Sequence, residues 1–243
     1  MMSDSSILKR TIHKHVIPSS LLSADRHVRV YLPPGYQEML SYPVVYCQDG
    51  EDFFNFGRIA TYANKLIIEE DMEPFIIVGV DVDKKIRTSE YSPDGERFES
   101  YTRAFVEEIV PFIEQHYPVR TDWTETVLAG DSLGGTVSLH LALLYPERFR
   151  QVISLSGAYY PYSQELIARE MDLSWLHLFM IVGLQETAFK TDRGVFDFVA
   201  LNRSAKQLLE DRGAHIQYSE HDGQHQWGFW QQHIPDALRF FLE

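Results

Sequence analysis

The fold is decided by one stretch near the middle of the chain, Thr126-Val127-Leu128-Ala129-Gly130-Asp131-Ser132-Leu133-Gly134-Gly135. Its first four residues read as a short buried strand, and the pattern of residues 134–145 is typical of a helix. Between them, Gly130-x-Ser132-x-Gly134 has the spacing of a nucleophile elbow, a sharp turn that lets a serine hydroxyl project into a site. Small residues are required two positions before and after the serine, because larger side chains would make strand and helix collide. The stretch therefore predicts Ser132 as a nucleophile.

Apolar runs of the same kind lie on both sides of this stretch. They cover residues 43–48, 74–80, 151–155 and 178–182, and residues 216–220 read as a last strand. Runs without polar alternation are typical of parallel strands that helices cover on both faces. Two earlier segments, residues 7–17 and 26–32, are instead expected to form an antiparallel hairpin, because the second alternates at the period of a half-buried strand.

Helical patterns alternate with these strands. They cover residues 59–70, 101–116, 134–145, 199–212 and 230–242. Gly213 follows the fourth of them as a stop signal. Alternating strands and helices with short connections predict a layered α/β domain, and we expect one domain over residues 1–243. Residues 87–96 are predicted to be a loop at the rim of the site.

Serine needs a base to take its proton, and after a nucleophile elbow the partners follow in the order serine, acid, histidine. In α/β sheets the site lies at the carboxyl ends of the strands. Two histidines, His221 and His225, follow the last expected strand. His225 comes after a glycine and before the closing helix, so it can point back to the sheet edge. We expect His225 to be the base and His221 to be structural.

The third partner should follow the strand expected over residues 178–182. Glu186 is the first carboxylate beyond it and is our choice, since a carboxylate would orient the imidazole and stabilise its charged form. Asp192 and Asp197 lie in the same loop region and remain alternatives.

A tetrahedral intermediate also needs hydrogen-bond donors for its oxyanion. One should be the backbone N–H of Leu133, the residue after the nucleophile. The other is expected in the loop after residues 43–48, where Asp49-Gly50 makes a tight turn and the Glu51 N–H follows.

Together these residues resemble the esterase-D-like, or "putative esterase", branch of the α/β-hydrolases, which includes enterochelin esterases, feruloyl esterases and mycolyltransferases. The similarity covers nearly the whole chain and is carried by Val30-Tyr31-Leu32-Pro33-Pro34-Gly35-Tyr36, Gln48-Asp49-Gly50, Ile76-Ile77-Val78-Gly79-Val80, residues 130–135 and His225-Gln226-Trp227-Gly228-Phe229-Trp230. It implies an α/β-hydrolase fold with a mostly parallel central sheet, antiparallel N-terminal strands, helices on both faces and no large cap domain. It also implies His225 as base, Glu186 as acid and Glu51 as second oxyanion donor.

Composition excludes several classes of protein. The 243 residues carry a net charge of −13, which argues against binding to nucleic acid or to an anionic membrane surface. The N-terminus lacks the pattern of a signal peptide and no long apolar run is present, so we expect a cytoplasmic protein. The single cysteine, Cys47, lies in an apolar run and is expected to be buried. Glu51, Asp52 and Asp131 lie around the expected nucleophile and predict an acidic rim that disfavours polyanionic esters.

A metal-dependent hydrolase is the first alternative to a serine hydrolase. It would use His221, His225 and an acid such as Asp222, but a glycine interrupts the pair and no H-E-x-x-H pattern is present. His13 and His15 share a strand face without a third ligand nearby in sequence. We therefore expect no metal and no other cofactor.

The sequence thus predicts a serine esterase that hydrolyses a small or medium ester through an acyl-enzyme intermediate. Tyr159, Tyr160 and Trp227 flank the site segments and are expected to line the substrate pocket. Acyl transfer or siderophore ester hydrolysis on the same triad stays open, as does association into a homo-oligomer. A catalytically silent binding protein is disfavoured, because nucleophile, base and acid are all present.

Overall fold

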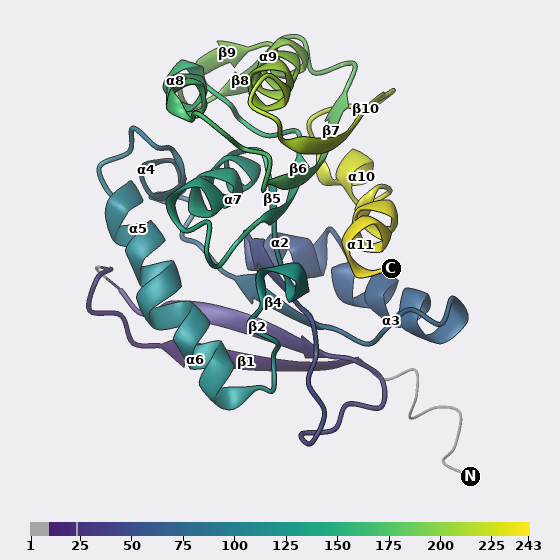
Figure 1. Ribbon diagram of the computed structural model, residues 1–243. Helices are drawn as coiled ribbons and strands as arrows, with labels where there is room; N and C mark the ends of the chain where they lie inside the picture. The colour runs from purple at the N-terminus through teal and green to yellow at the C-terminus, as the bar shows by residue number, and fades with distance from the viewer. Residues whose placement is uncertain (1–9, 23) are drawn as a thin grey trace.

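The computed structural model describes residues 10–22 and 24–243, and its centre is an eight-stranded sheet with the order β1-β2-β4-β3-β5-β6-β7-β10 (Figure 1). The strands are β1 (Thr11–Ile17), β2 (Arg26–Leu32), β3 (Val44–Gln48), β4 (Ile76–Val80), β5 (Thr126–Asp131), β6 (Gln151–Leu155), β7 (His177–Gly183) and β10 (His215–His221). Strand β2 pairs antiparallel with both β1 and β4, and every pair from β4 to β10 is parallel. The predicted sheet is confirmed, except that residues 7–9 of the first expected strand lie outside the described residues.

Helices cover both faces of this sheet (Figure 1). They are α2 (Gly50–Asn55), α3 (Ile59–Glu69), α4 (Arg87–Tyr91), α5 (Phe98–Ala104), α6 (Val110–His116), α7 (Leu133–Leu144), α8 (Pro161–Arg169), α9 (Phe198–Glu210), α10 (Trp227–Trp230) and α11 (Ile234–Leu242). Side chains of α5, α6, α7 and α9 pack with Val44 and Tyr46 in one core cluster. Those of α3, α10 and α11 pack with Val45 and Cys47 in the other. Successive residues of β3 thus point to opposite faces, as the pleat requires.

Two of the expected helices are interrupted, each near a proline. The helix predicted over residues 101–116 begins at Phe98 and contains a π-helical turn, Phe105–Ile109, just before Pro111. A proline lacks the N–H donor and its ring crowds the preceding turn, which the wider π turn relieves. The helix predicted over residues 230–242 is divided into α10 and α11, with Pro235 in the first turn of α11.

The segment over residues 87–96 corrects one expectation. It is not a simple rim loop, because it contains α4, in which Glu90 and Tyr91 are buried. Arg26 holds Glu90 in a buried ion pair with an N–O distance of 2.8 Å. In the described part of the chain, no domain-sized insertion follows any strand, so the sheet carries no large cap.

Other expectations concern burial. Cys47 is fully buried on β3, as its apolar surroundings predict, and burial raises the pKa of its thiol. Within residues 10–22 and 24–243, no helix has the length and apolar character needed to cross a lipid bilayer.

Candidate active site

The turn between β5 and α7 has the geometry of a nucleophile elbow. Ser132 has φ 51° and ψ −121°, a strained conformation for a residue with a side chain. Its N–H donates to the carbonyl oxygen of Leu155 at 2.9 Å, and its own carbonyl accepts from the N–H of Ala158 at 3.0 Å. A Cβ at Gly130 would lie 2.0 Å from the carbonyl carbon of Gly134, so the expected need for glycine is confirmed. Ser132 remains partly exposed while its two neighbours are buried.

His225 lies between Ser132 and Glu186. Its Nε2 is 3.0 Å from Oγ of Ser132, and its Nδ1 is 2.6 Å from Oε2 of Glu186. The side chain of His225 is 4% exposed and that of Glu186 is 0% exposed, so the contact is shielded from water. The three residues predicted from the sequence are therefore brought together from the β5–α7 turn, the β7–β8 loop and the β10–α10 loop.

The other oxygen of Glu186 is also bound. Oε1 accepts the N–H of Gly183 at 2.8 Å and the hydroxyl of Ser156 at 2.7 Å. The indole N–H of Trp230 donates in turn to Oγ of Ser156 at 2.8 Å. These contacts fix the carboxylate in one orientation toward His225. No motif in the sequence marks this role of Ser156.

The alternative acids lie elsewhere. Asp192 accepts a hydrogen bond from the hydroxyl of Thr88 at 2.7 Å. Asp197 is the N-cap of α9, where its side chain accepts the N–H of Ala200 at 2.9 Å. The structure therefore brings neither of them to His225.

The histidines considered as metal ligands are engaged in other contacts. His221 is exposed, and its ring stacks on His233 at 4.3 Å between centroids. His13 and His15 both approach the hydroxyl of Tyr117, at 3.0 and 2.6 Å. No group of three or more His, Cys, Asp or Glu side chains among the described residues is arranged to hold a metal ion.

The two expected oxyanion donors start helices. Leu133 is the first residue of α7, and Glu51 lies in the first turn of α2. The first N–H groups of a helix have no intrahelical acceptor, and so they are free to bind an anion. Gly50 packs on β4 so closely that a Cβ there would lie 2.3 Å from the carbonyl carbon of Gly79. Oε1 of Glu51 lies 2.9 Å from Nη2 of Arg29, so the side chain is engaged elsewhere. The expected oxyanion donor is the backbone N–H of Glu51.

Comparison with known proteins agrees with this geometry. The model of the "Putative esterase" family matches residues 19–241. The chain belongs to this family. It is 35% identical over 234 residues to the uncharacterized protein YjcH of Bacillus subtilis, covering 96% of this chain and 98% of that one. It is 24% identical over 185 residues to an acetyl esterase of Caldicellulosiruptor saccharolyticus, covering 60% of this chain and 66% of that one.

A solved structure confirms the fold. A ferulic acid esterase superposes with a TM-score of 0.81 at 19% identity, covering 96% of this chain and 98% of the other. The chain is therefore an α/β-hydrolase-type carboxylic ester hydrolase, as its sequence predicts.

Aromatic rings surround the histidine of this esterase. The ring of His225 lies 4.3 Å from Phe189, 4.1 Å from Phe198 and 4.8 Å from Trp230, measured between centroids. Phe189 belongs to a two-stranded hairpin, β8 (Phe189–Thr191) and β9 (Gly194–Phe196), that no pattern in the sequence predicts. The hairpin thus forms one wall of the site.

The three residues expected to line the substrate pocket, Tyr159, Tyr160 and Trp227, differ in their exposure to solvent. Tyr159 is fully buried and its hydroxyl donates to Oγ of Ser154 at 2.6 Å, so it has no surface to offer a substrate. The expectation for Tyr159 is therefore wrong. Tyr160 is 6% exposed and packs on Phe196 of the hairpin at 4.5 Å. Trp227 is partly exposed and packs edge-on against Phe53 at 4.9 Å.

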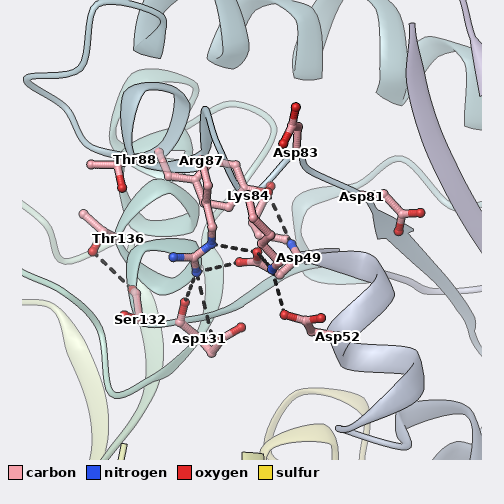
Figure 2. Close-up of polar contacts among 12 residues, drawn as sticks. Asp49, Asp52, Asp81, Asp83, Lys84, Arg87, Thr88, Asp131, Ser132 and Thr136 are labelled. Atoms are coloured by element: carbon pink, nitrogen blue, oxygen red, sulfur yellow. Dashed lines mark hydrogen bonds and ion pairs between the residues drawn. The ribbon is translucent and has the colours of Figure 1, made fainter. Parts of the chain in front are cut away.

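The carboxylates near Ser132 lie beside basic side chains. Glu51 is paired with Arg29, and Asp52 with Lys84 at 2.7 Å. Asp131 is 6% exposed and lies beside Arg87 (Figure 2). Burial, and then the neighbouring Asp49, raise the pKa of Asp131 to about 7. Each of these acids therefore has a cation beside it, but the cations are shared: Arg29 also pairs with Asp81, and Lys84 and Arg87 also pair with Asp49.

Proposed function

We propose that this esterase hydrolyses small or medium carboxylic esters in two steps through an acyl-enzyme on Ser132. The observation that carries the proposal is the position of His225, whose two ring nitrogens lie 3.0 Å from Ser132 Oγ and 2.6 Å from Glu186 Oε2. A base within hydrogen-bond reach of the nucleophile, oriented by a third group, is the arrangement that nucleophilic catalysis requires.

In the acylation step, Ser132 Oγ bonds to the ester carbonyl carbon while its proton passes to Nε2 of His225. The carbonyl oxygen becomes an oxyanion, which accepts hydrogen bonds from the N–H groups of Leu133 and Glu51. Collapse of this intermediate breaks the bond to the alcohol oxygen, which takes the proton from His225 and leaves. Glu186 stabilises the imidazolium that exists between these two transfers.

Deacylation repeats the sequence with water. His225 takes a proton from the water molecule as its oxygen bonds to the acyl carbon. The second tetrahedral intermediate expels Ser132 Oγ, which recovers its proton from His225, and the carboxylic acid is released. No cofactor enters this cycle. Acyl transfer to another alcohol would differ only in the molecule that replaces water.

The space beside His225 on the side of Glu186 is lined mainly by polar side chains, with one aromatic wall. A cavity of about 200 Å³ beside His225 is lined by residues that include Glu186, Ala188, Phe189 and Gln224. Phe189 is 37% exposed and offers an apolar ring face there. Ser132, Leu133 and Glu51 are not among its lining residues, so its volume does not fix the length of the acyl chain.

The test is hydrolysis of p-nitrophenyl esters of increasing acyl length, together with methyl ferulate. Ser132→Ala and His225→Ala should each lower kcat by about a millionfold or to the blank rate. Ser174→Ala, at an exposed serine, is the matched control and should keep wild-type turnover. Wild-type turnover in Ser132→Ala would refute the proposal.

A further inference from the structure

Two separate loops carry the groups that would surround the reacting carbonyl. Strands β3 and β5 are neighbours, and their last paired residues are Cys47 and Ala129. The segments 49–51 and 131–133 both lie beyond this last pair. The ladder between these two strands therefore ends before both loops, and side-chain contacts between the loops bear on how the nucleophile and the two oxyanion donors are spaced.

Arg87, the first residue of α4, reaches both loops (Figure 2). Its Nε and Nη2 donate to Oδ1 and Oδ2 of Asp49, each at 2.7 Å. The same Nη2 donates to the backbone carbonyl oxygen of Asp131 at 3.1 Å. A planar guanidinium offers several donors in one rigid fork, so a single side chain can hold two partners at a fixed spacing.

The contact to Asp131 falls on the peptide group just before the nucleophile. The carbonyl oxygen of this peptide accepts from Arg87, and its N–H, which belongs to Ser132, donates to Leu155 at 2.9 Å. With both ends bonded, the peptide plane resists rotation. Ser132 has φ 51°, and a strained conformation of this kind persists only where its surroundings hold it.

The contact to Asp49 is equally constrained. Its side chain is 0% exposed, and Lys84 adds a second cation to Oδ1 at 2.7 Å. Burial alone would raise the pKa of Asp49, but Arg87 and Lys84 hold it below its ordinary value. Oδ2 of Asp49 would lie 3.0 Å from a Cβ at Gly134, so the ion pair packs directly against the start of α7.

We propose that Arg87 is a positioning residue for ester hydrolysis, which clamps the loop carrying the Glu51 N–H and the elbow carrying Ser132 and Leu133 into one geometry. This inference rests on the proposed function. Arg87 acts through Asp49 and the Asp131 carbonyl rather than by touching the substrate. Its loss should therefore slow the chemical step and leave substrate binding nearly unchanged.

The experiment measures kcat and KM on p-nitrophenyl acetate for the wild type, Arg87→Lys and Arg87→Gln. We expect kcat to fall by about 10- to 100-fold, since misplacement by about an ångström has that effect, while KM stays within about threefold. The rate of fluorophosphonate labelling should fall by a similar factor. Arg203→Ala is the matched control, because it removes an exposed arginine of α9 that pairs with Glu220 of β10, and its kcat should be unchanged.

Chemical rescue separates positioning from a general loss of stability. Millimolar methylguanidinium should raise kcat of Arg87→Ala by about fivefold or more, since it can restore the missing donors. Equal concentrations of urea or sodium chloride should not. Methylguanidinium should not change kcat of Arg203→Ala, because this variant is expected to keep the wild-type kcat.

Several outcomes would overturn the inference. A folded Arg87→Gln enzyme with wild-type kcat would do so, as would a rise in KM with kcat retained, which would make Arg87 a substrate contact. If Arg87→Gln does not fold, the double variant Asp49→Asn/Arg87→Gln removes the buried carboxylate, which Lys84 alone would otherwise have to neutralise, and wild-type kcat in it has the same meaning. Failure of the proposed function is separate: the wild type would then take up no fluorophosphonate, or Ser132→Ala would hydrolyse esters equally well.

Discussion

The hydroxyl of Ser156 donates a 2.7 Å hydrogen bond to Oε1 of Glu186, the carboxylate oxygen that faces away from His225. Ser156 also accepts the indole N–H of Trp230 at 2.8 Å. The side chain of Ser156 therefore connects Trp230 of α10 to Glu186, the carboxylate that binds His225. It fixes the rotation of the carboxyl group while leaving Oε2 free for the imidazole.

Ser156→Ala tests this relationship. Glu186 keeps only the Gly183 N–H on Oε1, and the buried Trp230 N–H loses its acceptor, so we expect a loss of about 1–3 kcal/mol in unfolding free energy. We also expect kcat to fall by about tenfold, equivalent to about 1.4 kcal/mol, with KM little changed. Ser163→Ala is the control, since it removes a buried serine bonded to His140 at 2.7 Å away from the site. Equal kcat in the two variants would contradict the account.

Glu186→Gln tests the identity of the acid. Because the amide cannot stabilise the imidazolium or hold the same tautomer, kcat should fall by about a thousandfold to ten-thousandfold. Asp192→Asn should change kcat by less than about twofold, since an exposed contact with Thr88 is worth little. Steady-state kinetics of the variants on one ester measures these changes in kcat and identifies the acid. A large loss in Asp192→Asn or Asp197→Asn, with Glu186→Gln active, would mean that the wrong acid has been assigned.

Gly130→Ala tests the packing of the elbow. The added Cβ would lie 2.0 Å from the backbone of Gly134, so strand and helix would have to separate. We expect the variant to lose at least about 4 kcal/mol or fail to fold, a cost typical of severe strain. Gly194→Ala is the comparison, because its Cβ meets nothing closer than 3.7 Å despite φ 129°, and chemical denaturation should show a smaller loss. A stable, active Gly130→Ala enzyme would be incompatible with this geometry.

Asp131 should make stability depend on pH. Burial, and then Asp49, raise its pKa from 3.8 to about 7 in the folded state, so between these values the folded protein binds more protons than the unfolded one. The stability contributed by its protonated form is complete at low pH and is lost as the pH rises through about 7.

The variant Asp131→Asn stays neutral throughout this range. Its melting temperature relative to the wild type should therefore increase between pH 5 and pH 8, as measured by differential scanning calorimetry. A difference that stays constant over the range would show that Asp131 does not titrate there.

The sequence predicted those parts of the site that depend on local spacing. The elbow could be found because two glycines flank Ser132 between a strand and a helix, and His225 because it follows the last strand. Glu186 could be found because it is the first carboxylate after the strand that precedes the last one, and the family resemblance implies the same residue.

Parts that depend on distant contacts could not be predicted. Arg87 is 38 residues from Asp49 and 44 from Asp131 along the chain, and no periodic pattern marks so short a helix as α4. The strands β8 and β9 have only three residues each, too few for a detectable alternation. Tyr159 follows a strand end as a pocket residue would, but only the fold shows that its ring turns inward to Ser154.

The acyl-enzyme on Ser132 is tested most directly by pre-steady-state kinetics with a p-nitrophenyl ester that deacylates slowly, followed by mass spectrometry of the quenched protein. The account predicts a burst of p-nitrophenol close to one equivalent per active site. The acyl mass should lie on the peptide containing Ser132, and both signals should vanish in Ser132→Ala. Turnover without a burst and without an adduct, or an adduct that persists in Ser132→Ala, would contradict it.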